Sequence, residues 1–288
     1  MKILITGSEG QLGRSLRLTL DKDELVGLAH NQLDVTDYNK VREAVSSHRP
    51  ELIINASAFN DVDGAEARAE EAYAVNELGP RNLAIVSADR GIPLVHLSTD
   101  YVFDGASKRP YNEFDTPKPL SVYGASKLAG EKAVRSANPL HYIVRTAWLF
   151  SQYGKGFLLA MYGKASLPEL SVENDRYGSP TYVPHLAEGI ARLVKSENYG
   201  TYHIAGRGQA SRWDLVVELF RLLGIQTSVF PVSHRTFHAV AARPAFSVLT
   251  SSHPSAIVLP RWEEGVAALA RYLRSARNPE TERVYGRS

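Results

Sequence analysis

The chain opens with a short apolar run that leads directly into a glycine-rich turn, Lys2-Ile3-Leu4-Ile5-Thr6-Gly7-Ser8-Glu9-Gly10-Gln11-Leu12-Gly13. Leu12, Leu16 and Leu20 then recur at helical spacing. A strand, a G-x-x-G-x-x-G turn and an amphipathic helix form the first unit of a dinucleotide-binding fold, because glycine lets the backbone approach a pyrophosphate and the helix start offers N–H groups to it. This stretch therefore predicts the fold class and a bound dinucleotide, and a turn with only a packing role is the alternative.

Strand and helix signals continue to alternate through the first half of the chain. The expected strands are 2–6, 24–28, 52–55, 93–98 and 141–145, and the expected helices are 11–20, 39–47, 65–89 and 121–137. Strands separated by helices of this length predict a parallel sheet with helices on both faces. The expected fold is α/β, with a Rossmann-type, doubly wound parallel sheet in a dinucleotide-binding domain over residues 1–150.

The pattern becomes mixed after about residue 150. Helices are expected over 183–196 and 263–275, and Ser211 with Asp214 forms a capping box before a helix that Gly224 ends. We expect residues 151–288 to form mainly a smaller mixed substrate lobe, with some later segments returning to the first domain. The last residues, 277–288, read as a polar tail.

Composition excludes several classes of protein. Lys and Arg total 33 and Asp and Glu total 31 among 288 residues, so the formal net charge is +2, which argues against a nucleic-acid binder. The absence of cysteine excludes disulfides, thiolate catalysis, iron–sulfur clusters and cysteine-type zinc sites. No stretch approaches the ~20 apolar residues of a membrane span, and no export signal is recognisable, so a cytoplasmic location and no membrane partner are expected.

The sequence predicts no catalytic metal site. His234 and His238 are four residues apart, but no carboxylate accompanies them in a His-Glu-x-x-His arrangement. An isolated pair of this kind is more often a surface or packing feature. A structural divalent ion at a subunit contact is left open.

The end of the second expected strand bears on the choice of coenzyme. NAD-binding folds usually place an acidic residue there, about 20 residues after the glycine turn, to bind the ribose hydroxyls. Here the strand ends Leu28-Ala29-His30-Asn31, with neither an acid nor an arginine. The missing acid removes a repulsion against a 2′-phosphate and so favours NADPH. Asp34 lies just beyond and could reach the adenine, or could serve as a turn or capping residue.

Tyr123 and Lys127 carry the strongest chemical signal. Their i, i+4 spacing puts both side chains on one helix face. A tyrosine has an ordinary pKa near ~10, and a nearby ammonium lowers it and suits the phenol to proton transfer. Tyr-x-x-x-Lys is also common as a solvated surface pair, so the pair gains meaning only together with other motifs.

A second chemical motif, Leu97-Ser98-Thr99-Asp100-Tyr101-Val102-Phe103, lies at the end of the fourth expected strand. Ligands of open α/β sheets bind outside the carboxyl ends of the strands. Thr99 can donate a hydrogen bond to a carbonyl or hydroxyl oxygen there, and Asp100 can assist it. The alternative is a capped junction between strand and loop.

Together, the glycine turn, Ser98–Phe103 and Tyr123-x-x-x-Lys127 resemble the extended short-chain dehydrogenases/reductases. Further segments narrow this to a resemblance to the dTDP-4-dehydrorhamnose reductase family. These segments are Asn55–Phe59, Val62–Glu66, Ala74–Asn76, Tyr123–Glu131, Arg145–Trp148 and Gly178–Thr181. They run in order from residue 1 to about 185, and more weakly to about 275.

The resemblance implies that a nucleotide-linked 4-keto-6-deoxyhexose is reduced to dTDP-L-rhamnose, with NADPH or NADH as hydride donor. By the same resemblance, Tyr123 donates a proton to the sugar oxygen, and Lys127 binds the nicotinamide ribose and lowers the pKa of Tyr123. Thr99 and Asp100 would hold the keto group. The family also implies a homodimer, although no sequence feature marks its interface.

The resemblance further implies two sets of binding residues. The cofactor would contact Gly7, Gly10, Gln11, Leu12, Gly13, His30, Asp34, Val35, Ala58, Phe59, Asn60, Leu97, Tyr123 and Lys127. The nucleotide-sugar substrate would contact Thr99, Asp100, Trp148 and Arg243.

Two departures from the family pattern leave the exact sugar nucleotide open. The usual Arg-Pro with a following Leu-Asp appears here as Arg243-Pro244 with Leu249-Thr250, so the acid is lost. The usual Asn-Phe appears as Gly156-Phe157. Arg243 could pair with a substrate phosphate, and a surface or packing role fits it equally well.

Two other functions stay open. One is an NADP-binding regulatory subunit, like the partner of methionine adenosyltransferase that belongs to the same family. The other is a reductase or epimerase that acts on another nucleotide sugar.

Overall fold

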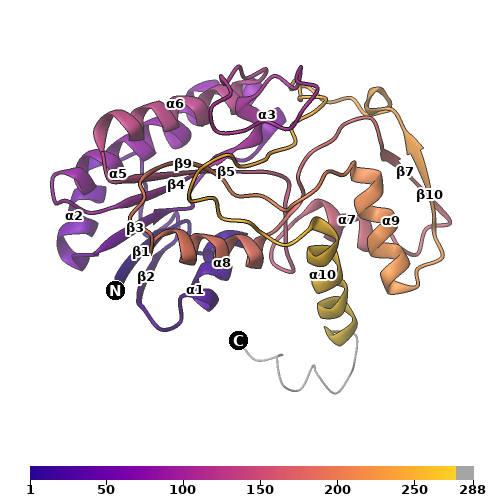
Figure 1. The fold of residues 1–288 in the computed structure, drawn as a ribbon, viewed down its shortest axis with the longest axis horizontal. Helices are drawn as coiled ribbons and strands as arrows, with labels where there is room; N and C mark the ends of the chain where they lie inside the picture. Colours follow the sequence, from indigo (N-terminus) through magenta and orange to yellow (C-terminus); the bar gives the residue numbers. More distant parts are fainter. Residues whose placement is uncertain (277–288) are drawn as a thin grey trace.

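A six-stranded parallel sheet forms the centre of the molecule, with strand order β2-β1-β3-β4-β5-β9 (Figure 1). The structure, a computed structural model, describes residues 1–276. The strands are β1 (Lys2–Thr6), β2 (Glu24–Leu28), β3 (Leu52–Asn55), β4 (Leu94–Thr99), β5 (His141–Thr146) and β9 (Gly200–His203). All five neighbouring pairs are parallel. The expected α/β class with a Rossmann-type sheet is confirmed, while the expected tail, 277–288, lies outside the described residues.

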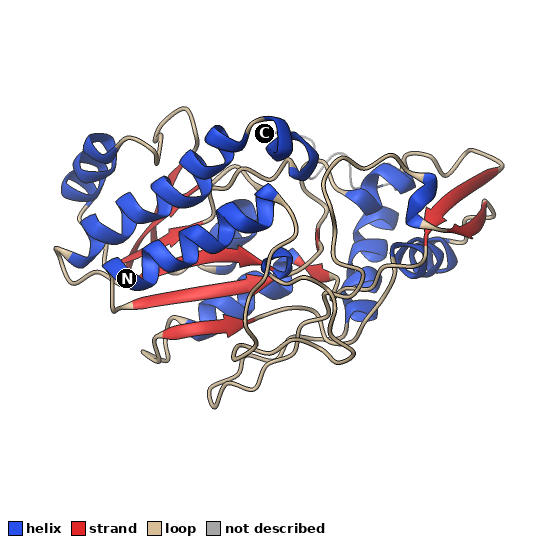
Figure 2. Ribbon diagram, turned by 90° about the horizontal axis from the view of Figure 1, so that it is seen from above, coloured by secondary structure: helices blue, strands red, loops and turns tan. Residues whose placement is uncertain are grey.

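Helices cover both faces of this sheet (Figure 2). One face carries α2 (Tyr38–His48), α5 (Gly79–Ala88) and α6 (Val122–Ala137), and the other carries α1 (Gln11–Thr19) and α8 (Val183–Leu193). Alternation along the strands produces this division, since Leu4 and Ile53 pack under the first group whereas Ile3 and Ile54 pack under the second. Strands buried on both faces explain the almost continuous apolar runs in the sequence.

The single helix expected over 65–89 is wrong, because the chain is interrupted at Arg68 and the helical stretch after it contains a π-helical turn, which gives four elements. They are α3 (Val62–Ala67), α4 (Ala69–Tyr73), a π-helical turn (Ala74–Leu78) and α5. Arg68 leaves helical geometry, at φ −125° and ψ 50°. The buried amide of Asn76 accepts the N–H of Phe59 at 2.9 Å and donates to the Phe59 carbonyl at 3.1 Å. This side chain, and not periodicity, ties the segment to the loop after β3.

Two later elements join the first domain. β9 pairs with β5, and α8 packs its apolar face on α1 against the same side of the sheet. The helices expected over 183–196 and 39–47 are confirmed with small shifts in their ends. β9 lacked a sequence signal, since Gly200–His203 reads Gly-Thr-Tyr-His and contains no apolar run.

A second, smaller lobe lies beside the carboxyl ends of the strands (Figure 1). It contains α7 (Phe157–Tyr162), α9 (Arg212–Leu223), α10 (Trp262–Ala276) and the strand pairs β6 (Leu149–Phe150) with β8 (Thr181–Tyr182) and β7 (Glu169–Glu173) with β10 (Ser228–Val232). The capping box is confirmed: Ser211 Oγ accepts the N–H of Asp214 at 3.1 Å, and the Ser211 N–H donates to the Asp214 carboxylate at 2.7 Å. Gly224 ends α9 in the left-handed region at φ +67°.

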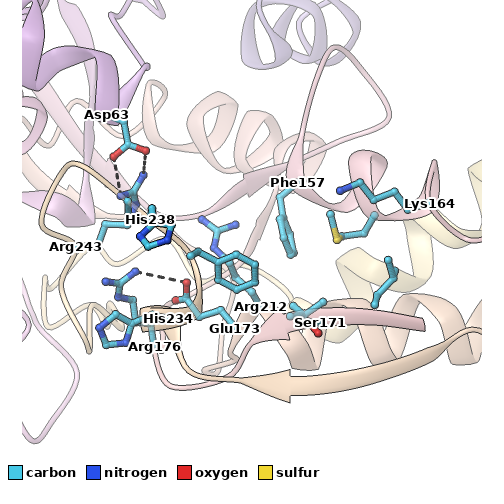
Figure 3. Close-up of a pocket in the computed structure, with 15 residues that line it drawn as sticks. Asp63, Phe157, Lys164, Ser171, Glu173, Arg176, Arg212, His234, His238 and Arg243 are labelled. Atoms are coloured by element: carbon cyan, nitrogen blue, oxygen red, sulfur yellow. Dashed lines mark hydrogen bonds and ion pairs between the residues drawn. The ribbon is translucent and has the colours of Figure 1, made fainter. Parts of the chain in front are cut away.

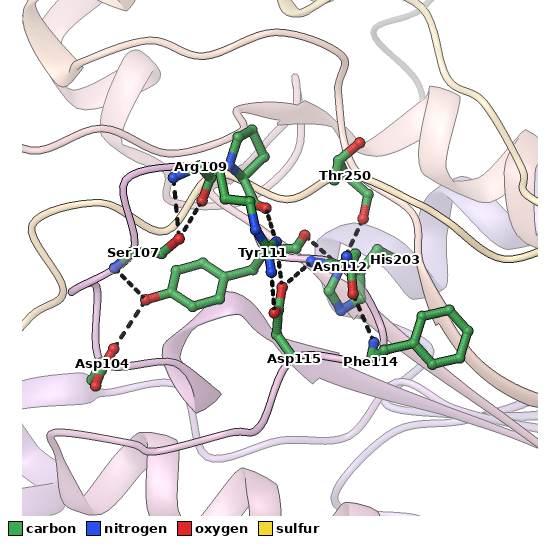
Figure 4. A network of polar contacts seen from close by, with 10 residues as sticks. Asp104, Ser107, Arg109, Tyr111, Asn112, Phe114, Asp115, His203 and Thr250 are labelled. Carbon is green, nitrogen blue, oxygen red and sulfur yellow. Dashed lines mark hydrogen bonds and ion pairs between the residues drawn. The ribbon is translucent and has the colours of Figure 1, made fainter.

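A polar network fixes the long loop between β4 and α6 (Figure 4). Tyr111 Oη donates to Asp104 at 2.9 Å, and Arg109 donates to both oxygens of Asp115 at 2.9 and 2.6 Å. His203 Nδ1 lies 3.0 Å from the Thr250 carbonyl oxygen and therefore joins β9 to the C-terminal segment. Within residues 1–276, no helix is both long and apolar enough to cross a membrane.

Candidate active site

The glycine turn adopts the geometry that its spacing predicts. Gly7 has φ +65°, and a Cβ there would lie 2.8 Å from the Ala56 carbonyl oxygen. A Cβ on Gly13 would lie 2.5 Å from the Gly7 carbonyl oxygen, so this glycine permits close packing of α1 on β1. Gly10 caps α1 without a side-chain acceptor, and the helix therefore presents its first N–H groups toward the cavities described next.

Two cavities meet at this turn. The inner cavity, of about 370 Å³, is lined by Gly10, Gln11, Leu12, Ala56, Ala58, Asn60, Leu97, Ser98, Thr99, Asp100, Tyr123, Lys127, Thr146, Ala147, Trp148 and Leu149. The outer cavity, of about 390 Å³, is lined by Gly7, Glu9, Gly10, Ala29, His30, Leu33, Asp34, Val35, Ala56, Ser57, Ala58, Phe59, Asn60, Glu71 and Val75. Gly10, Ala56, Ala58 and Asn60 line both, which makes them one continuous trough around the turn.

Every residue expected to contact the cofactor lines one of these two cavities, except Gly13. An extended trough that passes a glycine turn and an uncapped helix start fits a dinucleotide, with its pyrophosphate at the turn. The adenosine end would occupy the outer cavity, and the nicotinamide end would occupy the inner one. Asp34 Oδ1 accepts the Thr36 N–H and hydroxyl at 2.9 and 2.8 Å, and these bonds lower the pKa of Asp34.

The residues expected to do the chemistry converge in the inner cavity from two elements. Thr99 is the last residue of β4 and Asp100 is the next residue, and Tyr123 and Lys127 project from α6. α6 approaches the turn after β4 closely because it carries Gly124, where a Cβ would lie 2.2 Å from the Tyr101 carbonyl oxygen. Thr99 Oγ1 donates to Asp100 Oδ1 at 3.1 Å, and the side chains of Thr99 and Tyr123 are hydrogen-bonded.

The electrostatics of Tyr123 differ from the expectation. Burial raises the pKa of Tyr123 above its ordinary value, and the nearby Asp100 and Tyr101 raise it further. The expected lowering by Lys127 is therefore not seen, because Lys127 Nζ donates instead to the Leu97 carbonyl oxygen at 2.5 Å. A phenol with a raised pKa stays protonated at neutral pH, which suits a proton donor better than a base.

Burial shifts the pKa values of both Lys127 and Asp100 toward neutrality. Burial lowers the pKa of Lys127 to about 8, and the carboxylate of Glu131 acts against this shift. Burial raises the pKa of Asp100 to about 6, against hydrogen bonds from Ser247 and Thr99. Two buried groups whose pKa values are displaced in opposite directions mark this cavity as a candidate catalytic centre.

Ser247 comes from the C-terminal segment 239–250, which we call the strap. Its hydroxyl donates to Asp100 Oδ2 at 2.5 Å. The strap also reaches α3 at Asp63, whose carboxylate accepts Arg243 Nη1 and Nη2 at 2.9 and 2.8 Å. The guanidinium of Arg243 therefore forms an ion pair within the chain, which agrees with the packing role considered for this residue.

Trp148 lines the inner cavity in an unusual backbone conformation. Its φ of +47° is rare for a large side chain. The indole Nε1 is buried without a hydrogen-bond partner. Arg212 lies over the Trp148 ring at 5.0 Å and over the Phe157 ring at 4.7 Å. The Nε1 edge of the indole packs against Gly178, where a Cβ would lie 2.7 Å from Nε1, so this donor faces the protein interior.

Arg212 also reaches a third cavity, in the smaller lobe (Figure 3). This lobe cavity, of about 350 Å³, is lined by Asp63, Phe157, Met161, Lys164, Leu170, Ser171, Val172, Glu173, Arg176, Arg212, His234, Phe237, His238, Ala239 and Arg243. Arg243 is paired with Asp63, and Arg176 lies 3.5 Å from Glu173. Lys164 and Arg212 make no ion pair within residues 1–276, so the cavity offers positive charge on apolar and aromatic walls.

His234 and His238 both line the lobe cavity. His234 Nδ1 lies 2.9 Å from Asp175 Oδ2, an interaction typical of a surface pair. In the described part of the chain, no group of three or more His, Asp or Glu side chains is arranged to hold a metal ion.

Several residues of these cavities were missed in the sequence. Glu9 lies inside the glycine turn itself, yet only its neighbours belong to the motif. Arg212 follows the recognised cap Ser211, but its stacking on Trp148 spans two distant segments. Ser247 lies within the strap segment already noted for its departures, and only the fold brings it to Asp100.

Comparison with known proteins agrees with this geometry. The sequence profile described as the RmlD substrate binding domain matches residues 1–275. A dTDP-4-keto-6-deoxy-D-glucose reductase from Streptomyces niveus is 41% identical, over 85% of this chain and 87% of that protein. A dTDP-4-dehydrorhamnose reductase from Sinorhizobium fredii is 36% identical, over 93% of this chain and 96% of that protein.

A solved structure shows how far the fold is shared. The crystal structure of dTDP-4-dehydrorhamnose reductase from Bacillus anthracis in complex with NADP is 36% identical, with a TM-score of 0.91. The match covers 94% of this chain and 99% of that one. The chain therefore belongs to the RmlD substrate-binding-domain family, the dTDP-4-dehydrorhamnose reductase family that its motifs resemble.

Proposed function

We propose that this chain is an NADPH- or NADH-dependent reductase that converts dTDP-4-dehydro-6-deoxy-L-mannose (dTDP-4-dehydrorhamnose) into dTDP-L-rhamnose. The observation that carries the proposal is the convergence of Thr99, Tyr123 and Lys127 in one cavity that opens into the dinucleotide trough. Relatives with this activity in their names support it, as does a structure of similar fold that holds NADP.

The cofactor supplies a hydride to C4 of the sugar, and the residues of the inner cavity handle the proton. Tyr123 donates its phenolic proton to the sugar O4, and its raised pKa keeps that proton in place until the oxygen gains charge. Thr99 gives up its hydrogen bond to Asp100 and donates to the keto oxygen instead, which holds that oxygen in line with Tyr123. Lys127 binds the nicotinamide ribose and gives positive charge to the cavity as the phenolate forms.

We propose that the smaller lobe binds the nucleotide part of the substrate. Arg212 and Lys164 lie in the lobe cavity without carboxylate partners within residues 1–276, and they are suited to a diphosphate. Phe157 and Phe237 offer aromatic faces to a base. Trp148 lines the inner cavity and would contact the sugar there. The domain division proposed is residues 1–150 with α8 and β9 for the cofactor, and the remaining residues mainly for the substrate.

A second candidate differs only in the sugar. The relative from Streptomyces niveus is a dTDP-4-keto-6-deoxy-D-glucose reductase, and at 41% identity it supports reduction of the sugar that has not been epimerised.

The test is consumption of NADPH and of NADH with each sugar nucleotide, epimerised and unepimerised, followed by identification of the product. Oxidation that depends on the epimerised sugar supports the first candidate, and oxidation with only the unepimerised sugar supports the second. Binding of the cofactor without turnover of either sugar would contradict both and support the regulatory-subunit alternative.

We also propose that the protein acts in the cytoplasm as a homodimer, as the family resemblance implies. Light scattering during size-exclusion chromatography would measure the mass directly. A mass of one chain at micromolar concentration would contradict the dimer.

A further inference from the structure

The outer cavity contains a carboxylate at the place where the sequence offered none. Glu9 lines this cavity together with Ala29 and His30, the residues that follow β2. The backbone fixes this neighbourhood, since the Ser8 N–H donates to the Leu28 carbonyl oxygen at 3.3 Å. NAD-binding folds usually have an acidic residue at the end of the second strand. In this chain the acid near that position is Glu9, which belongs to the glycine turn.

The other carboxylates of the outer cavity are committed elsewhere. Asp34 is bound by Thr36, and Glu71 accepts a hydrogen bond from Arg68 at 3.2 Å. Glu9 lines the cavity beside the residues that follow β2, where the adenosine ribose of a dinucleotide in this trough would lie, and its own partners are exposed arginines.

Two arginines of α1 hold Glu9. Arg14 Nη2 lies 3.2 Å from Glu9 Oε2, and Arg17 Nη1 lies 3.1 Å from Glu9 Oε1. All three side chains are about half exposed, so solvent screens the pairs and their exchange for another partner costs little. The cluster therefore combines an acceptor for a hydroxyl with two donors for a phosphate.

We propose that the cluster Glu9–Arg14–Arg17 sets the preference of this chain between NADH and NADPH, an inference that rests on the dinucleotide-binding part of the proposed function. The Glu9 carboxylate accepts the 2′-hydroxyl of NADH. The 2′-phosphate of NADPH takes the place of that carboxylate on Arg14 and Arg17, and Glu9 turns out to solvent. The residual repulsion between Glu9 and the phosphate limits the affinity for NADPH.

The test is to titrate NADPH and NADH into the protein in the absence of any sugar. Nicotinamide fluorescence monitors each titration and gives the dissociation constant of each dinucleotide. Glu9→Gln should lower the dissociation constant of NADPH by about threefold to tenfold, and should leave the dissociation constant of NADH unchanged or raise it. Arg17→Gln should weaken NADPH by about threefold to tenfold and change NADH by less than about twofold. Added salt should shrink both effects.

Matched controls come from α2. Glu43→Gln and Arg42→Gln make the same changes of charge at exposed positions of that helix and should leave the ratio of the two dissociation constants unchanged. Thermal unfolding of each variant checks that it is folded. A ratio that stays constant in Glu9→Gln and Arg17→Gln, or that moves equally in the controls, would overturn the inference while cofactor binding itself stands. Failure of the parent chain to bind either dinucleotide would instead overturn the cofactor part of the proposed function, and this inference with it.

Discussion

Tyr123 is a buried phenol whose pKa is raised by burial and not lowered by its lysine neighbour. If it is the proton donor, Tyr123→Phe removes the donated proton and leaves the shape of the cavity almost unchanged. We expect kcat/KM to fall by about 10²–10⁴ while the dissociation constant of NADPH stays within about twofold. Steady-state kinetics and fluorescence titration measure the two quantities separately, and a variant with full turnover would remove Tyr123 from this role.

Lys127 titrates within the range of an ordinary assay. Its pKa is lowered to about 8, so the ammonium is present below pH 8 and is lost as the pH rises through that value. We expect the rate of reduction to decline above about pH 8, because the charge that supports the phenolate disappears. In Lys127→Arg the guanidinium stays charged, so whatever rate remains should show no such decline. The same alkaline limb in both proteins would assign it to another group.

A substitution at Gly124 would test how α6 positions the site. α6 carries Tyr123 against the turn that follows β4 only because position 124 has no side chain, since a Cβ would lie 2.2 Å from the Tyr101 carbonyl oxygen. Gly124→Ala should destabilise the fold by about 1–3 kcal/mol in urea unfolding and lower kcat, since α6 must move away. At Gly163, a Cβ would meet its nearest atoms at an ordinary 3.5 Å, so Gly163→Ala is a matched control with an expected change below about 0.5 kcal/mol. Equal destabilisation of the two variants would contradict the close-approach argument.

The elements that sequence reasoning predicted are those specified by neighbouring residues. β1, the glycine turn and α1 lie within residues 2–19, and the spacing of Tyr123 and Lys127 lies within one helix. The hydrogen bonds between Asn76 and Phe59 were missed because they bridge 17 residues. The strap was missed for the same reason at greater distance, since Ser247 and Asp100 are 147 residues apart. Periodicity reports which face of an element is buried and carries no information about such partners.

At the scale of the whole molecule, the strap joins the two halves of the site. It supplies Ser247 to Asp100 in the inner cavity and Arg243 to Asp63 at the edge of the lobe cavity. If one lobe binds the cofactor and the other binds the nucleotide sugar, the hydride has to pass from one bound molecule to the other. The distance between the two lobes must therefore be held constant. Asp63 accepts four hydrogen bonds from the strap, two of them from backbone N–H groups of residues 240 and 241.

This attachment should have a pH dependence of known sign. The hydrogen bond and charge of Arg243, together with the two N–H groups, lower the pKa of Asp63 to about 2, below the ordinary value of ~3.9. A depressed pKa contributes stability that is present above pH ~4 and is lost as the pH falls toward 2. Asp63→Asn should therefore lower the free energy of unfolding at neutral pH by about 1 kcal/mol, a modest value because the carboxylate is 41% exposed and screened by solvent. The difference between the two proteins should shrink as the pH falls from about 4 to 2.

The same variant should raise KM for the sugar nucleotide more than it changes cofactor affinity, since the strap borders the lobe cavity and lies away from the outer cavity. Urea unfolding across this pH range measures the first effect, with Asp21→Asn, an exposed carboxylate far along the chain from the strap, as the control. A pH-independent difference would show that Asp63 stabilises the molecule through its shape and not through its charge.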